Sequence, residues 1–134
     1  MTEGTRMSET DKAYLAGLID TAGVIHVMRE YHRKKVVRRE IALDLLGLRR
    51  AQVAWLMDHV KGVREYRTGT RLVTRWAATA FMQAMDYIVS KKSEAALVFK
   101  FASAIASKSA ALTQQQINIR AEVDAELAAL KRGA

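Results

Sequence analysis

LAGLIDTAG, residues 15–23, followed at once by VIHVMREY, residues 24–31, is the stretch that decides the fold. The first segment is the second half of a predicted helix over Glu9–Thr21, because apolar residues recur in it at helical spacing. This apolar stripe is formed by Leu15, Leu18 and Ile19. Gly23 can end the helix, and the β-branched residues after it favour a strand. The stretch therefore predicts a helix that leads directly into a β-strand.

The strand Val24–Tyr31 is the first half of a predicted hairpin. A basic turn, His32–Lys35, separates it from a second strand, Val36–Leu46. Alternation gives this hairpin one apolar and one polar face. The apolar face consists of Ile25, Val27, Val37, Ile41, Leu43 and Leu45, interrupted by Arg39. The polar face consists of His26, Met28, Glu30, Val36, Arg38, Glu40, Ala42 and Asp44.

The rest of the chain repeats this order and ends in helices. We predict an amphipathic helix over Arg49–Lys61 and a second hairpin from Val63–Thr68 and Arg71–Ala77, around Gly69. Further helices are predicted over Ala78–Ser90, Ser93–Ala106 and Thr113–Arg132. The economical arrangement is an α+β fold, helix-hairpin-helix-hairpin-helix, with a four-stranded antiparallel sheet, helices on one face and C-terminal helices. With 134 residues, we expect one domain, residues 1–134, with its core at about 9–132.

The composition narrows the class of function. A net charge of +8 suits a polyanion such as nucleic acid, although it also suits a solubility device or a membrane-surface patch. Without cysteine, disulfides, thiolate metal sites and a cysteine nucleophile are excluded. The N-terminus is neither a secretory signal nor a transit peptide, and no apolar run suits a membrane span. We therefore expect no membrane partner and an intracellular location, cytoplasmic or organellar.

The segment LAGLIDTAG resembles the LAGLIDADG motif of homing endonucleases, with seven of nine positions identical. The order of elements over residues 11–132 and the lysine-rich segment KKSEAAL, residues 91–97, are also similar to that family. The resemblance implies the LAGLIDADG homing endonuclease fold. Because the chain has one motif, it also implies a homodimer in which two motif helices pack together. The interface residues it implies are Leu15, Gly17, Leu18, Asp20 and Thr21.

The resemblance further implies a partner, double-stranded DNA with a pseudo-palindromic site. Two sheets would form a concave saddle along the major groove, where β-ribbons can read base edges. The DNA-binding residues expected on this basis are His26, Met28, Glu30, His32, Lys34, Arg38, Glu40, Arg67, Arg71 and Arg75. A solvated sheet face is the other explanation of the alternating arginines. The sequence does not separate arginines that read bases from those that hold phosphates. The histidines lack the spacing of metal ligands, and we expect Trp55 and Trp76 in the core.

One feature departs from the family pattern. The family's eighth motif residue is an acid that binds a divalent metal, usually Mg²⁺, whereas this chain has Ala22. Phosphodiester hydrolysis needs such a metal, and hard cations need oxygen ligands. Asp20 lies about 200° around the helix from that position and resembles a structural residue near the subunit junction. We assign no residue to a metal and expect that Mg²⁺ is not bound productively. A natural homolog or an engineered Asp-to-Ala change would both give Ala22.

Two other residues are implied at the catalytic position, and two other functions stay open. Lys91 matches the family's basic residue near the scissile phosphates, and Arg49 lies near the position of a polar residue that organises water. We expect this homing endonuclease subunit to bind its site without cutting it. The alternatives are a DNA-binding transcriptional regulator, which needs no acid, and an RNA-binding intron maturase, which would prefer structured RNA.

Overall fold

The computed structural model describes residues 7–105 and 111–133. Its first half contains α1 (Glu9–Ala22), β1 (Gly23–His32), β2 (Lys35–Leu46) and α2 (Arg50–His59). The second half contains β3 (Arg64–Tyr66), β4 (Gly69–Val73), α3 (Arg75–Ala84), the short 3-10 helix η2 (Met85–Tyr87), α4 (Lys92–Ala102) and α5 (Gln114–Gly133). The predicted order of elements is confirmed. The predicted end of the helix before α5, residue 106, lies outside the described residues.

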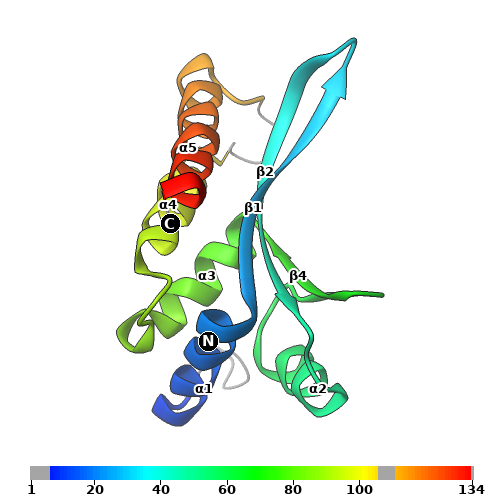
Figure 1. Ribbon diagram of the computed structural model, residues 1–134, viewed down its shortest axis with the longest axis vertical. Coiled ribbons are helices and arrows are strands. Elements are labelled where there is room, and N and C mark those ends of the chain that lie inside the picture. The colour runs from blue at the N-terminus through cyan, green and yellow to red at the C-terminus, as the bar shows by residue number, and fades with distance from the viewer. Residues whose placement is uncertain (1–6, 106–110, 134) are drawn as a thin grey trace.

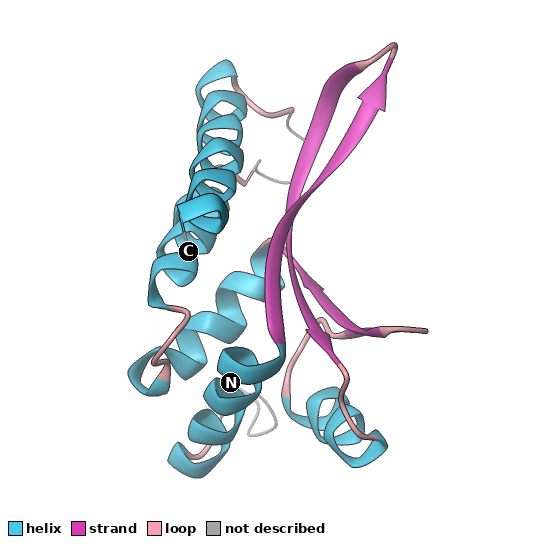
Figure 2. Ribbon diagram, in the orientation of Figure 1, coloured by secondary structure: helices cyan, strands magenta, loops and turns pink. Residues whose placement is uncertain are grey.

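The sheet has four antiparallel strands in the order β1-β2-β4-β3. Helices α1, α3, α4 and α5 lie along one side of the long β1–β2 hairpin, and α2 lies beside the far end of β2 (Figures 1 and 2). Alternation explains the core, because Ile25 pairs with Leu43 and Val27 with Ile41 on the helix-covered face. The predicted α+β fold with a four-stranded antiparallel sheet is thus confirmed. None of the described helices is both long and apolar enough to span a bilayer.

The tip of the β1–β2 hairpin departs from strict alternation. Arg33 and Lys34 form a two-residue turn with φ angles of 51° and 68°, which suits the twist of a hairpin. Glu30 pairs with Arg38, whereas the next residue, Tyr31, pairs with Val36, so one residue of β2 is extra and forms a bulge. That residue, Val37, is 56% exposed. Its predicted place on the apolar face is therefore wrong, because the bulge shifts the alternation.

The junction of β4 and α3 also differs from the prediction. The strand predicted to reach Ala77 ends at Val73, and the helix predicted from Ala78 begins at Arg75. Between them Thr74 has a φ of 37°; its backbone N–H donates to Ile41 O at 2.7 Å. Its hydroxyl donates to Glu40 Oε1 at 2.5 Å. These bonds to β2 fix the residue that turns the chain from strand to helix, which local alternation did not reveal.

The C-terminal helix α5 is attached to the hairpin by an ionic cluster. Arg29 and Arg39 are directly paired across β1 and β2 and lie on the face towards α5. Both donate through Nε to Asp124 Oδ2 at 2.8 Å, and Arg29 Nη2 also donates to Oδ1. Asp124 is 8% exposed. The charge that interrupts the apolar face of β2 therefore has a partner on α5.

Candidate nucleic-acid interface

A cationic groove of about 990 Å³ lies over the polar face of the sheet. Its walls come from all four strands, the start of α3 and α5. Five arginines and one carboxylate are among the residues that line it: Arg38, Arg64, Arg71, Arg75, Arg120 and Glu40. Met28, Tyr66, Val73, Thr74 and Trp76 complete much of the surface between them. The groove therefore combines excess positive charge with hydrogen-bond donors and apolar surface, as a nucleic-acid interface requires.

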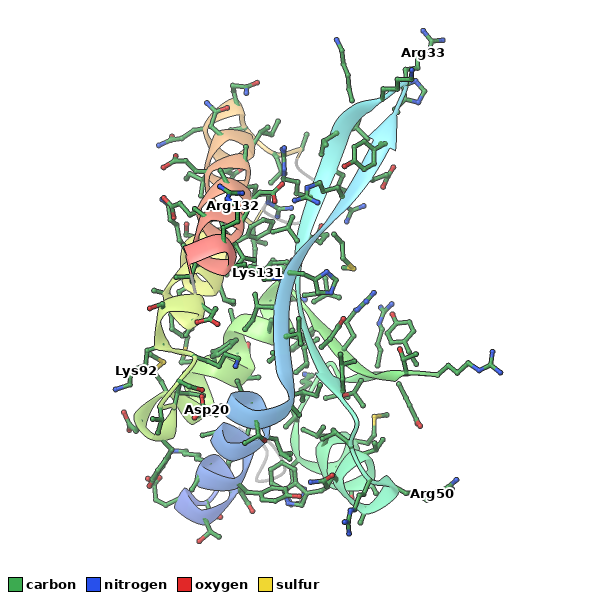
Figure 3. The ribbon with its side chains drawn as sticks, viewed as in Figure 1. Asp20, Arg33, Arg50, Lys92, Lys131 and Arg132 are labelled. Atoms are coloured by element: carbon green, nitrogen blue, oxygen red, sulfur yellow. The ribbon has the colours of Figure 1, made fainter. Side chains whose placement is uncertain are left out.

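The structure brings together only part of the DNA-binding set predicted from the sequence. Met28, Arg38, Glu40, Arg71 and Arg75 line the groove, and His26 lies beside it on β1. Glu30, His32 and Lys34 are exposed near the tip of the hairpin, which projects beyond the helices; Arg33 marks this tip in Figure 3. Arg67 lines a separate hollow of about 450 Å³ between α2 and the β3–β4 hairpin. Arg75 reaches the groove from the first turn of α3, because β4 has already ended there.

Asp44 organises the centre of the polar face. It accepts hydrogen bonds from Arg71, Nε to Oδ1 at 2.7 Å and Nη2 to Oδ2 at 3.1 Å. His26 Nε2 lies 2.8 Å from the same Oδ2. Burial alone would raise the pKa of the Asp44 carboxyl, but the hydrogen bonds and charges of Arg71 and His26 outweigh it and lower that pKa. Asp44 is therefore ionised at neutral pH.

Glu40 organises the side of the groove near α5. It accepts hydrogen bonds from Thr74 Oγ1 at 2.5 Å and from Arg38 Nε at 3.1 Å. Arg120 Nη1 lies 3.5 Å from Oε2, the oxygen that also accepts from Arg38, and donates to Arg39 O at 2.6 Å. Burial would raise the pKa of Glu40, but these partners together lower it. Glu40, the one carboxylate among the residues that line the groove, is therefore ionised and hydrogen-bonded.

Arg120 is a groove residue that the sequence did not reveal. Its side chain is 7% exposed and its guanidinium stacks 4.8 Å from the Phe101 ring centroid. It comes from α5, about 80 residues from Glu40 along the chain. The available signal was a charged residue three positions before Val123, on the stripe of α5 that becomes buried. This spacing indicates that Arg120 is buried, but it does not indicate which residues Arg120 contacts.

Asp20, at the end of α1, fixes the segment that leads into α4. Its carboxylate accepts from the backbone N–H groups of Val89 at 2.8 Å and of Ser90 and Lys91 at 3.1 Å. In Figure 3 it lies beside that segment, close to the start of α4. Burial would raise the pKa of Asp20, but these hydrogen bonds outweigh it and lower the pKa. The carboxylate therefore serves as a structural cap.

The same contacts place Lys91 beside the last turn of α1. Its Nζ lies 3.3 Å from Asp20 O, two residues from Ala22. Arg49 lies elsewhere, exposed at the start of α2, where its backbone N–H donates to Gln52 Oε1 at 2.7 Å. Within the described part of the chain, no hydrogen bond joins Arg49 to Lys91. Of the catalytic positions inferred from the resemblance, Lys91 lies against the last turn of α1, the turn that contains Ala22, whereas Arg49 lies at the start of α2.

The residues at this end of α1 do not fit a magnesium ion. Ala22 has a methyl group where the family pattern has an acid, and the Asp20 carboxylate is occupied by three backbone N–H groups. Across residues 7–105 and 111–133, no group of three or more His, Asp or Glu side chains could hold a metal. Hard cations need several oxygen ligands, so no reaction step is assigned to a metal in this chain.

The outer face of α1 is open in the protomer. Gly17 and Thr21 are exposed there, and a Cβ added to Gly17 would meet nothing within 4 Å. Leu15 and Leu18 were expected at a subunit interface, but both are buried inside the protomer, with 0% and 6% exposure. On a helical wheel Leu15 lies about 160° from Gly17, whereas Leu18 lies only about 60° from Thr21. The side of α1 that is available to a second chain carries Ala13, Tyr14, Gly17 and Thr21.

The fold is similar to that of homing endonuclease structures that contain DNA. One is the homing endonuclease I-CvuI in complex with its target in the presence of calcium, with a TM-score of 0.64, 18% identity, and coverage of 90% of this chain and 82% of that chain. Another is I-CvuI with the I-CreI target in the presence of magnesium, with the DNA not cleaved; the TM-score is 0.55, the identity 16%, and the coverage 86% and 95%. No family model and no curated protein matches the sequence. The chain therefore has the homing endonuclease fold, and its likeness to that family is confirmed at the level of the fold.

Proposed function

We propose that this chain is a LAGLIDADG-type subunit that binds a specific site on double-stranded DNA without cutting it. The observation that carries the proposal is the arginine-lined groove on the polar face of the four-stranded sheet. The likeness to I-CvuI supports it, because those structures are complexes with target DNA. An antiparallel ribbon of this kind fits the major groove, where each base pair presents a distinct pattern of donors and acceptors.

The proposal includes a homodimer that is built on α1. The exposed, small-residue side of this helix allows two backbones to approach closely, which supports pairing of two copies around Gly17. A two-fold dimer has two identical grooves, so its target would be a pseudo-palindrome. The charge of the protomer, +8, doubles in the dimer. Binding then releases counterions, and affinity should fall steeply between low and moderate salt.

The absence of cleavage follows from the end of α1. Ala22 offers no anionic oxygen, and the Asp20 carboxylate is held by the segment before α4. The described residues therefore support recognition of DNA and not hydrolysis. Lys91 beside the last turn of α1 supplies positive charge there, which can contact a phosphate whether or not the strand is cut.

The test is selection from a random duplex library with the unsubstituted protein, followed by incubation with the selected site in Mg²⁺. We expect tight, salt-sensitive binding with both strands intact. Ala22→Asp restores the missing carboxylate and should produce cleavage of the same site, and adding Lys91→Ala should slow that cleavage more than it weakens binding. Efficient cutting by the unsubstituted chain would contradict the proposal.

A transcriptional regulator is the second candidate, and Ala22 favours it. Such a protein needs a specific site but no acid at position 22. If Ala22→Asp binds its site tightly and never cuts it, the regulator becomes the better description. An intron maturase would bind structured RNA in preference to the selected duplex, so a folded intron RNA is the informative competitor in the same assay.

A further inference from the structure

Arg71 is held in one orientation by residues from the other three strands. Asp44 on β2 binds its Nε and Nη2, and Met28 Sδ on β1 accepts from its Nη1 at 3.2 Å. Tyr66 on β3 places its ring centroid 5.1 Å from the guanidinium carbon. Side chains of this length ordinarily lose rotamer freedom on binding, and these contacts remove that freedom beforehand. Arg71 is therefore preorganised before any ligand arrives.

The geometry of the ion pair decides which donors remain. A guanidinium is planar and has five N–H groups in a fixed fork. Asp44 occupies the side of that fork made by Nε and Nη2. Nη1 has two N–H groups and donates one of them to Met28 Sδ, so its second N–H and the outward N–H of Nη2 are the donors left for another acceptor. Arg71 lines the groove and Asp44 is not among the residues that line it, so we expect the groove to present the side of Arg71 that faces away from Asp44.

The electrostatics favour a base over a phosphate as that acceptor. The carboxylate of Asp44 is ionised and cancels the charge of Arg71, and it would repel a phosphate brought to the same place. A base edge requires directional donors and no net charge. Two parallel N–H groups match O6 and N7 of guanine in the major groove. Arg64, the partner of Arg71 across β3 and β4, is exposed and offers an uncancelled charge nearby, within the described part of the chain.

We propose that Arg71 recognises guanine in the major groove and that Asp44 is the positioning residue that aims it. This inference rests on the proposed DNA-binding function and adds the base and the edge that are recognised. Each half of a pseudo-palindromic site would contain one such guanine. His26, on the far side of Asp44, holds the carboxylate in place and would not touch the base through this contact.

The first test replaces single atoms of the DNA. The relevant guanine is the position whose preference disappears when Arg71→Ala is used to select sites. A duplex with 7-deazaguanine there lacks the N7 acceptor and should bind the unsubstituted protein about tenfold more weakly. Inosine keeps O6 and N7 and should bind as guanine does. Arg71→Ala should show no difference between the three bases, which removes effects of the base analogue that do not pass through Arg71.

The second test concerns positioning. Asp44→Asn keeps the size of the side chain and removes its charge, so the guanidinium loses its fixed orientation. We expect discrimination between guanine and adenine at that position to fall several-fold, with thermal unfolding confirming that the variant is folded. The control is Arg64→Ala, which should weaken all duplexes equally and make the salt dependence shallower by about one unit of slope. Asp44→Asn should not make the salt dependence shallower.

Four outcomes would overturn the inference. Equal weakening of all duplexes by Arg71→Ala would identify a phosphate contact. Unchanged discrimination in folded Asp44→Asn would remove the positioning role. Failure of the unsubstituted protein to bind any duplex would overturn the proposed function and this inference with it, whereas specific binding without a 7-deazaguanine effect would overturn this inference alone.

Discussion

Asp20 connects two segments that are about 70 residues apart in the chain. One carboxylate accepts hydrogen bonds from the three consecutive residues that lead into α4. The Lys91 N–H lies at the start of α4, where backbone N–H groups otherwise lack partners, and the N–H groups of Val89 and Ser90 belong to the segment before the helix. Asp20 therefore stabilises the start of α4 from the end of α1.

We predict that Asp20→Ala lowers the free energy of unfolding by about 2 kcal/mol, because three backbone N–H groups lose a charged acceptor. The measurement is urea denaturation followed by circular dichroism. Asp58→Ala on the exposed side of α2 is the control and should change stability little. Equal effects of the two substitutions would contradict the capping role.

We expect the pH dependence of stability to come mainly from four partly buried carboxyl groups. Asp20, Glu40, Asp44 and Asp124 all have a pKa below the ordinary value, because hydrogen bonds to their ionised forms outweigh burial. A carboxyl whose pKa is lower in the folded state stabilises the fold above its unfolded pKa, and this contribution is lost as pH falls through the folded pKa.

The free energy of unfolding should therefore be steady near neutral pH and fall progressively below about pH 4. Urea denaturation at a series of pH values between 6 and 3 measures this. Asp124→Asn should flatten the dependence, because it removes one of the four groups. Stability that increases on acidification would contradict the assignment.

At the scale of elements, α5 is attached to the hairpin by an ionic cluster around the buried Asp124. Asp124 accepts from both Arg29 and Arg39 and so joins α5 to β1 and β2, and Arg120 adds a hydrogen bond to Arg39 O on β2. Removal of one partner from a buried ion pair leaves charges without compensation, and the loss is typically larger than the worth of the intact pair. The attachment of α5 to the sheet should thus be sensitive to this one residue.

We predict that Asp124→Ala destabilises the fold by about 3 kcal/mol and increases hydrogen exchange in α5 more than in α1. Glu122→Ala is a matched control on the same helix, because its partner Lys100 is exposed and such pairs contribute little. Comparable losses from both substitutions would show that the buried cluster has no special role.

The sequence predicted several helices and strands, but it did not predict the junction of β4 and α3 or the bulge in β2. Alternation predicted which residues of β1 and β2 face the helices, since one side of the hairpin is buried. The stretch from Thr74 to Ala77 fits both an alternating and a helical pattern, and the bonds from Thr74 to Glu40 and Ile41 decide between them. The bulge at Val37 has no local signal of its own.

The candidate site was predictable where it lies on a single hairpin. Met28, Arg38 and Glu40 follow from the alternation of β1 and β2. Arg120 and Asp124 come from a helix 80 or more residues away, and their partners depend on how α5 crosses the hairpin. The role of Asp44 was also not evident, because it depends on the register that places it opposite Arg71.

At the scale of the whole molecule, Gly17 is expected to matter for the proposed dimer and not for the folding of the protomer. A Cβ added there meets nothing within 4 Å in the protomer, and Gly17 is exposed, so we expect the fold to have room for a side chain. The proposed dimer has no room for a side chain at this position, because two helices can approach closely only where side chains are small. Replacement of glycine within a helix also favours the helical state by up to about 1 kcal/mol.

Gly17→Leu should therefore leave the protomer folded and convert the dimer to a monomer. Light scattering at micromolar concentration measures the mass, and circular dichroism confirms the fold. Ala51→Leu, at an exposed position of α2, is the control and should stay dimeric. A dimer that survives Gly17→Leu would place the interface on another surface.

The sequence of the hairpin tip can change with little effect on the stability of the fold. Residues 30–38 are exposed apart from the half-buried Val36, and they project beyond the helices (Figure 1). Substitutions at such positions usually change stability by no more than about 0.5 kcal/mol. In the proposed dimer, the tips would lie over the outer base pairs of the target, far from Asp44 and Arg71. Single substitutions in the tip can then change which outer bases are preferred, in evolution or by design. The contacts of Arg71 and Asp44 would stay the same, so the central part of the target would not change.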